Sequence, residues 1–158
     1  MKTLSPIELP LNCTALIEAS AGTGKTFTMA NLYLRLLLGI GCAPLTVEQI
    51  LVVTFTKAAT EELRDRIRKN IKACCIFLQE YDTEKSYDTN DFFFQLAQRI
   101  EGVEEAILRL RIAEREIDLA SIFTIDSFCQ KMLFQFAFDS GVRFDSDLQP
   151  DENDLLRR

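Results

Sequence analysis

Hydrophobic positions along the chain follow two spacings, one typical of strands and one typical of helices. Three short runs, at 14–18, 50–55 and 121–125, contain consecutive apolar or β-branched residues and predict strands. The run at 50–55 is almost wholly apolar, which indicates a strand covered on both faces. Between and after these runs, apolar residues recur every three or four positions and predict helices. Strands that alternate with helices predict an α/β domain with a mainly parallel sheet flanked by helices.

The helical spacing also gives the expected helix boundaries. The second helix carries one apolar stripe, made by Ala59, Leu63, Ile67, Ile71, Cys74 or Cys75, and Leu78. A capping-box pattern at 46–49 predicts one further turn, and a polar linker is expected at 79–90. Gly102 separates two helices that are expected to form a hairpin. The predicted helices lie at 25–39, 57–78, 92–100, 103–119 and 127–138.

The segment between the first strand and the first helix carries the strongest chemical signal. Gly22 and Gly24 allow a tight turn that aims consecutive N–H groups inward as an anion nest. The helix that follows points its N-terminal N–H groups and its positive dipole end at the same place. Lys25 supplies a mobile positive charge for the outer phosphates of a nucleotide, and the Thr26 hydroxyl is a ligand for Mg²⁺. The segment consists of Ala19, Ser20, Ala21, Gly22, Thr23, Gly24, Lys25 and Thr26.

This spacing is that of the phosphate-binding loop, G-x-x-x-x-G-K-[ST], with Ala19 at the first glycine. Alanine is small enough for that turn. The alternative is a chance glycine-rich loop in which Lys25 is merely solvated. Because a strand precedes the loop and a helix follows it, we predict that residues 19–26 bind ATP together with Mg²⁺.

Three loops are expected at one edge of the sheet, because ligands of parallel sheets gather at the carboxyl ends of the strands. They are 19–26, 54–57 and 124–127. In the second and third, a strand ends in threonine and a helix begins with small polar residues, and such helix starts bind anions. A nucleic-acid backbone therefore fits across them, unless the hydroxyl groups only cap helices. The residues with these hydroxyl groups are Thr54, Thr56, Thr124 and Ser127.

Composition narrows the classes of function. The 158-residue chain suits one domain with a real core, and its lack of histidine excludes Ser-His-Asp and Cys-His nucleophiles and histidine metal sites. Five cysteines without a C-x-x-C pair predict buried or idle thiols in a reducing cytosol. With no signal peptide or membrane span, we expect a soluble cytoplasmic protein without a membrane partner. The net charge of −6 argues against a generally basic surface, but between Lys57 and Lys72 six basic residues outnumber three acidic ones.

Three segments, in this order, resemble motifs I, Ia and Ib of superfamily 1 DNA helicases. They are residues 19–26, residues 50–67 and the sequence Phe-Thr-Ile-Asp-Ser-Phe-Cys at 123–129. Within that superfamily, the amino-acid sequence of the loop and of the leucine-rich run after it is most similar to the RecB family. The AddA family is the next most similar. The resemblance implies a P-loop NTPase (RecA-like) fold. Residues 1–140 would form the N-terminal part of an incomplete first motor domain, domain 1A, and the acidic tail at 141–158 would start an accessory subdomain.

The resemblance also implies a role for each motif. Motif I would cradle the ATP phosphates, with Lys25 on the β- and γ-phosphates and Thr26 on Mg²⁺. Phe55 would either pack in the core or offer its ring to a base. The DNA contacts implied for motifs Ia and Ib are Thr54, Phe55, Thr56, Lys57, Thr124, Ser127 and Phe128.

Two positions depart from the family pattern. Asp126 stands where motif Ib usually has histidine, and a carboxylate repels a DNA phosphate, so we assign Asp126 no DNA contact. At the end of an apolar strand, Asp126 has a second interpretation as the acid that holds Mg²⁺ through water. No glutamine precedes Gln49, so the adenine-reading glutamine of many relatives has no counterpart upstream of the loop.

The function implied is that of an ATP-dependent DNA helicase and exodeoxyribonuclease subunit in recombinational repair of double-strand breaks. ATP hydrolysis would drive translocation on single-stranded DNA from duplex ends, in a heterotrimer with RecC-like and RecD-like subunits. The acid motif, the second motor domain and the nuclease centre have no counterpart in 158 residues, so this chain alone is expected to bind nucleotide weakly and not to turn it over. The alternatives are a small P-loop phosphotransferase and a non-catalytic nucleotide-binding module.

Overall fold

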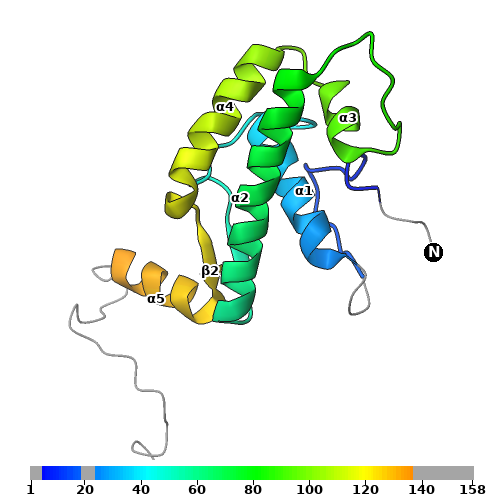
Figure 1. Ribbon diagram of the computed structural model, residues 1–158. Helices are drawn as coiled ribbons and strands as arrows, with labels where there is room; N and C mark the ends of the chain where they lie inside the picture. Colours follow the sequence, from blue (N-terminus) through cyan, green and yellow to red (C-terminus); the bar gives the residue numbers. More distant parts are fainter. Residues whose placement is uncertain (1–4, 19–23, 137–158) are drawn as a thin grey trace, which may run out of the picture.

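A computed structural model describes residues 5–18 and 24–136 (Figure 1). The predicted loop residues 19–23 and the predicted tail at 141–158 lie outside the described residues. Within the described ranges, no helix has both the length and the apolar character needed to cross a membrane. The elements in order are α1 (Lys25–Leu38), β1 (Val52–Thr54), α2 (Lys57–Glu80), α3 (Phe92–Ala97), α4 (Val103–Glu116), the 3₁₀ helix η1 (Ile117–Leu119), β2 (Ile122–Thr124) and α5 (Ile125–Gln135).

The two described strands form a small parallel sheet, which confirms the α/β prediction for this part of the chain. Val52 pairs with Ile122, and Thr54 pairs with Thr124. Both strands are shorter than the apolar runs that predicted them. The prediction that β1 is covered on both faces is wrong, because Val52 is buried whereas Val53, which points to the opposite face, is 42% exposed. Helix α2 covers the first face only.

The predicted strand at 14–18 does not form in this structure. These residues have no regular secondary structure, and Leu16 is 85% exposed. The sheet of the described residues contains β1 and β2 alone. A strand needs a hydrogen-bonded neighbour, and an apolar run that pairs with no other strand remains irregular.

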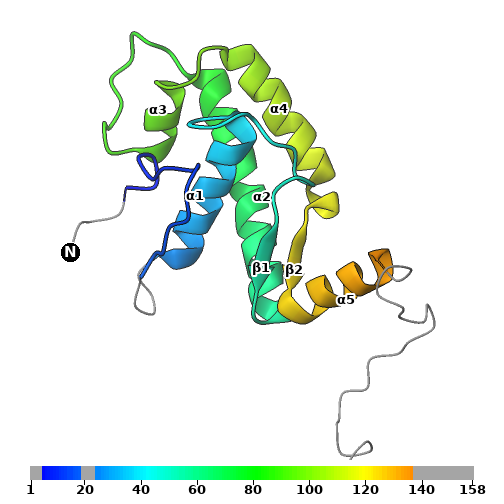
Figure 2. The same ribbon diagram turned by 180° about the vertical axis from the view of Figure 1, so that it is seen from behind.

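Three helices form the core of the fold. Helices α1 and α2 lie side by side with their N-terminal ends at the same end of the molecule, and α4 packs along both in the opposite direction (Figures 1 and 2). The stripe predicted for α2 is buried, except that Ala59 is exposed and Thr60 takes its place with 8% exposure. The largest fully buried apolar side chains include Leu34, Ile71 and Leu110, one from each helix.

Several helix boundaries differ from the prediction. Helix α3 ends at Ala97, the predicted 103–119 helix changes to 3₁₀ geometry at Ile117, and α5 starts at Ile125 because Thr124 is its N-cap. Helices α3 and α4 pack mainly on α2 instead of forming a hairpin with each other. The linker, which was predicted to be polar and to begin at residue 79, begins after Glu80. It contains two aromatic residues, Tyr81 and Tyr87, whose ring centroids lie 5.5 Å apart.

A buried arginine fixes the N-terminal segment to α1. Nη1 of Arg35 donates hydrogen bonds to the carbonyl oxygens of Pro6 and Leu9, both at 2.7 Å, and Nη2 donates to the carbonyl oxygen of Ile40 at 3.2 Å. Arg35 is 4% exposed, and burial lowers the pKa of its guanidinium. Ile7, beside Pro6, is buried in the core. The segment is therefore packed against the helical layer, although it contains no strand.

Alkaline pH should destabilise the protein through two buried acids of this core. Burial raises the pKa of Tyr33 from 10.0 to about 12 and that of Cys74 from 9.0 to about 12. The folded state holds both protons more tightly, so this stabilisation is complete below pH 9 and is lost as the pH rises from about 9 to about 12. Urea unfolding at a series of pH values will show the decline. The decline should be shallower for Cys74→Ala, and an equally steep decline would contradict the contribution of Cys74.

Candidate functional site

The starts of α2 and α5 lie at the same edge of the sheet. Thr54 and Thr124 pair in register at the carboxyl ends of two parallel strands, so the segments 54–57 and 124–127 leave the sheet side by side (Figure 2). The Thr54 hydroxyl lies 2.6 Å from that of Thr60, which fixes the end of β1 to α2. The prediction that these two loops share an edge is confirmed.

The hydroxyl groups at this edge cap the helices. The Thr56 hydroxyl accepts a hydrogen bond from the N–H of Ala59 at 3.1 Å, and the Thr124 hydroxyl accepts one from the N–H of Ser127 at 3.2 Å. The hydroxyl groups of Thr124 and Ser127 are also 2.8 Å apart. The capping interpretation therefore holds for Thr56 and Thr124, whereas the Thr54 hydroxyl donates to the carbonyl oxygen of Thr56 at 3.1 Å. DNA contacts by these residues remain a prediction.

Phe55 is the most exposed apolar side chain at this edge. It is 86% exposed, which rules out core packing here and leaves its ring face accessible. Lys57, the first residue of α2, is also exposed. Phe128 is half-buried, with its ring 6.5 Å from that of Phe123, over which Lys131 places its Nζ at 4.6 Å from the ring centroid. Proteins bind single-stranded nucleic acids with such groups: exposed aromatic rings stack on the bases, and nearby cations contact the phosphates.

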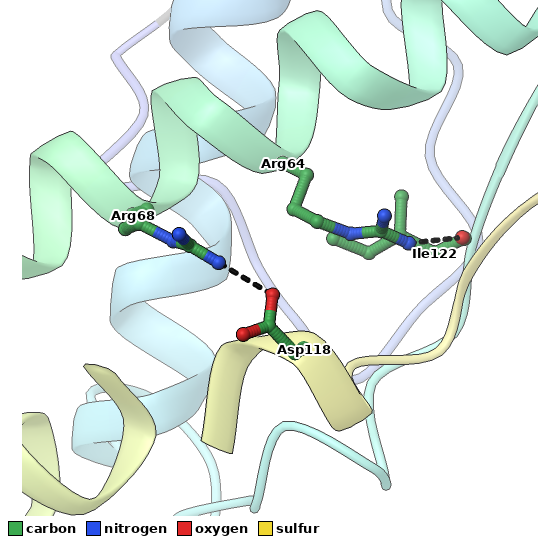
Figure 3. A network of polar contacts seen from close by, with 4 residues as sticks. All are labelled: Arg64, Arg68, Asp118 and Ile122. Carbon is green, nitrogen blue, oxygen red and sulfur yellow. Dashed lines mark hydrogen bonds and ion pairs between the residues drawn. The ribbon is translucent and has the colours of Figure 1, made fainter. Parts of the chain in front are cut away.

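Two arginines of α2 contact the second strand and the 3₁₀ helix before it (Figure 3). Nη2 of Arg64 donates to the carbonyl oxygen of Ile122 at 3.2 Å, and Nη2 of Arg68 lies 2.5 Å from the Asp118 carboxylate. The N–H of Val52 donates a hydrogen bond to the carbonyl oxygen of Ser121, the residue before Ile122, so that carbonyl faces β1. Because carbonyls alternate in direction along a strand, the Ile122 carbonyl faces away from β1, and Arg64 binds β2 on that outer edge. Sequence reasoning placed Arg64 only on an amphipathic helix, because its partner is 58 residues away.

Arg64 also lines a groove of 270 Å³ between α2 and the β2–α5 turn. Its Nε is buried and has no hydrogen-bond partner among the described residues. Lys57 adds a second positive charge and Glu61 a negative one. The groove is lined by Lys57, Thr60, Glu61, Arg64, Ile122, Phe123, Thr124 and Ser127.

The described part of the predicted nucleotide loop is its end, at the start of α1. Gly24 has φ of +86°, a left-handed conformation that favours glycine, and an added Cβ would meet no atom of the described residues within 4 Å. Among the residues that the structure describes, no side chain caps α1. The first N–H groups of the helix therefore fit a phosphate, which is the anion that such a start binds. Lys25 is exposed and Thr26 half-buried beside this start.

Asp126 lies in the first turn of α5 and is exposed. Its side chain is therefore near the start of a helix whose N-cap is already Thr124. Neither a role with Mg²⁺ nor one with DNA follows from its contacts. The Mg²⁺ role and the expected lack of a DNA contact both stay predictions.

Comparison with known proteins places the chain in a family. The family described as UvrD/REP helicase N-terminal domain matches residues 2–157. The RecBCD enzyme subunit RecB of Escherichia coli strain K12 is 51% identical over 99% of this chain, and that of Haemophilus influenzae is 50% identical over 98%. The RecB subunit of Mycobacterium tuberculosis strain H37Rv is 32% identical over 90% of this chain. The chain spans 13% of the length of the first two relatives.

These matches confirm the resemblance to helicases that three short motifs predicted. They extend beyond the motifs and cover nearly every residue, including 81–121, where no motif was recognised. The small parallel sheet with helices packed on it agrees with part of a helicase motor domain. The chain belongs to the UvrD/REP helicase family, within its N-terminal domain.

Proposed function

We propose that this chain is the ATP-binding and DNA-contacting part of an ATP-dependent DNA helicase subunit. The observation that carries the proposal is the pairing of Thr54 with Thr124, which brings two helix starts of a helicase-family chain to one edge of a parallel sheet. Residues 19–26 bind the phosphates of ATP, with Lys25 at the outer phosphates and Thr26 at Mg²⁺. Residues 1–140 form part of the first motor domain, and 141–158 begin an accessory subdomain.

The DNA path runs along the shared edge of the sheet. The exposed ring of Phe55 stacks on a base, and Lys57 contacts a phosphate. The N-terminal ends of α2 and α5 direct their remaining free N–H groups towards the same DNA strand. Ser127 and Phe128 contact this DNA strand from the α5 side. Because Arg64 ties β2 to α2, the two starts keep a fixed spacing.

In the full-length protein, ATP hydrolysis drives translocation on single-stranded DNA. The name shared by the relatives, RecBCD enzyme subunit RecB, supports an assembly with RecC-like and RecD-like subunits. We propose that this assembly is a cytoplasmic helicase and exodeoxyribonuclease that acts on broken duplex ends during recombinational repair. This chain supplies binding and orientation of ATP and DNA in that assembly, and hydrolysis requires further parts of the motor.

Phe55→Ala should weaken the binding of single-stranded DNA about 5- to 150-fold, because stacking on an aromatic ring contributes about 1–3 kcal/mol per base. Lys57→Ala should weaken binding at low salt and reduce the slope of log affinity against log salt by about 0.7. The measurement is fluorescence anisotropy of a labelled oligo(dT) over a range of salt concentrations.

The matched controls lie away from the sheet edge. Leu108→Ala removes an apolar side chain of α4 that is 58% exposed, and Lys69→Ala removes an exposed cation of α2. Both should bind DNA like the wild type. If Phe55→Ala and Lys57→Ala also bind like the wild type, the DNA path does not run along this edge.

A further inference from the structure

The side chain of Arg64 reaches from α2 to the outer edge of β2 (Figure 3). Its Nη2 donates to the carbonyl oxygen of Ile122, which faces away from β1. The N–H of the same residue donates to the carbonyl oxygen of Ala120 at 2.8 Å. Arg64 therefore links α2 to β2 through the carbonyl that pairing with β1 leaves free.

The groove beside β2 offers a second interpretation, in which Arg64 binds a DNA phosphate. The contacts of the guanidinium oppose it, because Nη2 is bonded to Ile122 and Nε is buried. Glu61 also lines the groove, and its carboxylate repels a phosphate. Lys57 is exposed at the first residue of α2 and is the better phosphate contact. The guanidinium of Arg64 is thus directed at the protein backbone.

The position of the α5 start depends on β2. None of the described residues of α5 is buried, so this helix has little packing of its own. Its N-cap, Thr124, follows Ile122 by two residues along the same extended chain. A displacement of Ile122 therefore moves Thr124 and the Ser127 N–H that the Thr124 hydroxyl caps at 3.2 Å.

Arg68 makes a second contact between α2 and this segment, to the Asp118 carboxylate in η1. The side chains of this ion pair are 45% and 77% exposed. Exposed ion pairs contribute little to stability, because water and salt screen them. Ile122, in contrast, is 1% exposed, so the contact made by Arg64 is the stronger of the two.

We infer that Arg64 is a positioning residue for DNA, which fixes the start of α5 relative to the start of α2 without touching the DNA. This inference rests on the proposed DNA path, and it adds how the α5 side of that path is oriented. A binding surface whose two sides are fixed in advance loses less freedom on binding and binds more tightly. Loss of Arg64 should weaken the contacts on the α5 side and leave those on the α2 side intact.

The test is the affinity of Arg64→Met for a labelled oligo(dT), measured by fluorescence anisotropy over a range of salt concentrations. Methionine keeps an apolar stem and removes the donors. Affinity should fall about three- to tenfold, the range expected for one hydrogen bond. The slope of log affinity against log salt should stay unchanged, because the proposed α5 contacts carry no cation. A direct phosphate contact by Arg64 would instead reduce that slope by about 0.7.

Arg66→Met is the matched control. It removes the same side chain and charge from the same helix, but Arg66 pairs with Glu62 of α2 at 3.5 Å and lies away from β2. This variant should bind oligo(dT) like the wild type.

Combined variants show on which side of the path Arg64 acts. Arg64→Met and Ser127→Ala both affect the α5 side, so the loss in the double variant should be smaller than the product of the two single losses. With Phe55→Ala, on the α2 side, the two losses should multiply. Losses that multiply with Ser127→Ala as well would contradict an action through α5.

A measurement on the wild type needs no variant. In a nuclear magnetic resonance titration with oligo(dT), the Nε–H resonance of Arg64 should move less than the backbone amide of Phe55. An equal or larger shift at Arg64 would show a direct DNA contact and overturn the inference. So would a reduced salt slope or wild-type affinity in Arg64→Met, while Phe55→Ala still binds more weakly. If the wild type does not bind oligo(dT), the proposed DNA path fails and this inference fails with it.

Discussion

Lys25→Ala should bind a non-hydrolysable ATP analogue with Mg²⁺ at least about tenfold, and up to about 100-fold, more weakly than the wild type. A charge-assisted hydrogen bond from an ammonium group to phosphate contributes about 1.5–3 kcal/mol, and removing the cation also removes its attraction for the remaining phosphate charge. Lys25 is exposed, so its removal leaves the core unchanged. Calorimetry with and without single-stranded oligonucleotide measures the effect.

Two comparisons make this result specific. Lys69→Ala removes an exposed cation from α2 and should bind the analogue like the wild type. Triphosphate affinity should fall together with analogue affinity in Lys25→Ala, because both ligands present phosphates to the same ammonium group. Unchanged binding in Lys25→Ala would contradict the phosphate loop. Phosphate transfer from ATP to a small acceptor without DNA would instead favour a phosphotransferase.

The helical part of this fold is largely predictable from residue spacing. One face of a helix becomes buried according to positions three or four apart, and that information is local. Leu63, Ile67 and Ile71 are buried on α2 as the spacing predicts. The N-caps Thr56 and Thr124 are local signals as well, because each hydroxyl bonds an N–H three residues on. Their shared position then follows from parallel pairing.

The strands and the polar contacts are less predictable from the sequence, because they depend on distant parts of the chain. Whether residues 14–18 form a strand depends on a neighbouring strand and not on their own apolar sequence. In the same way, the burial of the Val53 side chain depends on which element packs on that face of the sheet. Arg64 finds its carbonyl partner 58 residues away, and Asn31 meets Asn70 across 39 residues. Periodicity within a helix identifies buried positions, but it does not indicate which buried amide lacks a partner.

Leu34→Ala should lower the free energy of unfolding by about 3–5 kcal/mol, a large share of the 5–15 kcal/mol typical of a domain. Leu34 has 0% exposure on α1, at the layer where this helix packs against α2 and α4. The close packing of three helices around it allows little collapse, so the lost contacts and the cavity both contribute. Urea unfolding followed by circular dichroism measures the change.

Leu108→Ala is the matched control for this loss, since the same atoms are removed from a side chain that is 58% exposed on α4. It should change the free energy of unfolding by less than about 0.5 kcal/mol. Leu34 lies on the helix that begins with Lys25, so its packing fixes the position of this proposed phosphate contact. If Leu34→Ala loses no more stability than the control, α1 is held in place by contacts other than this packing.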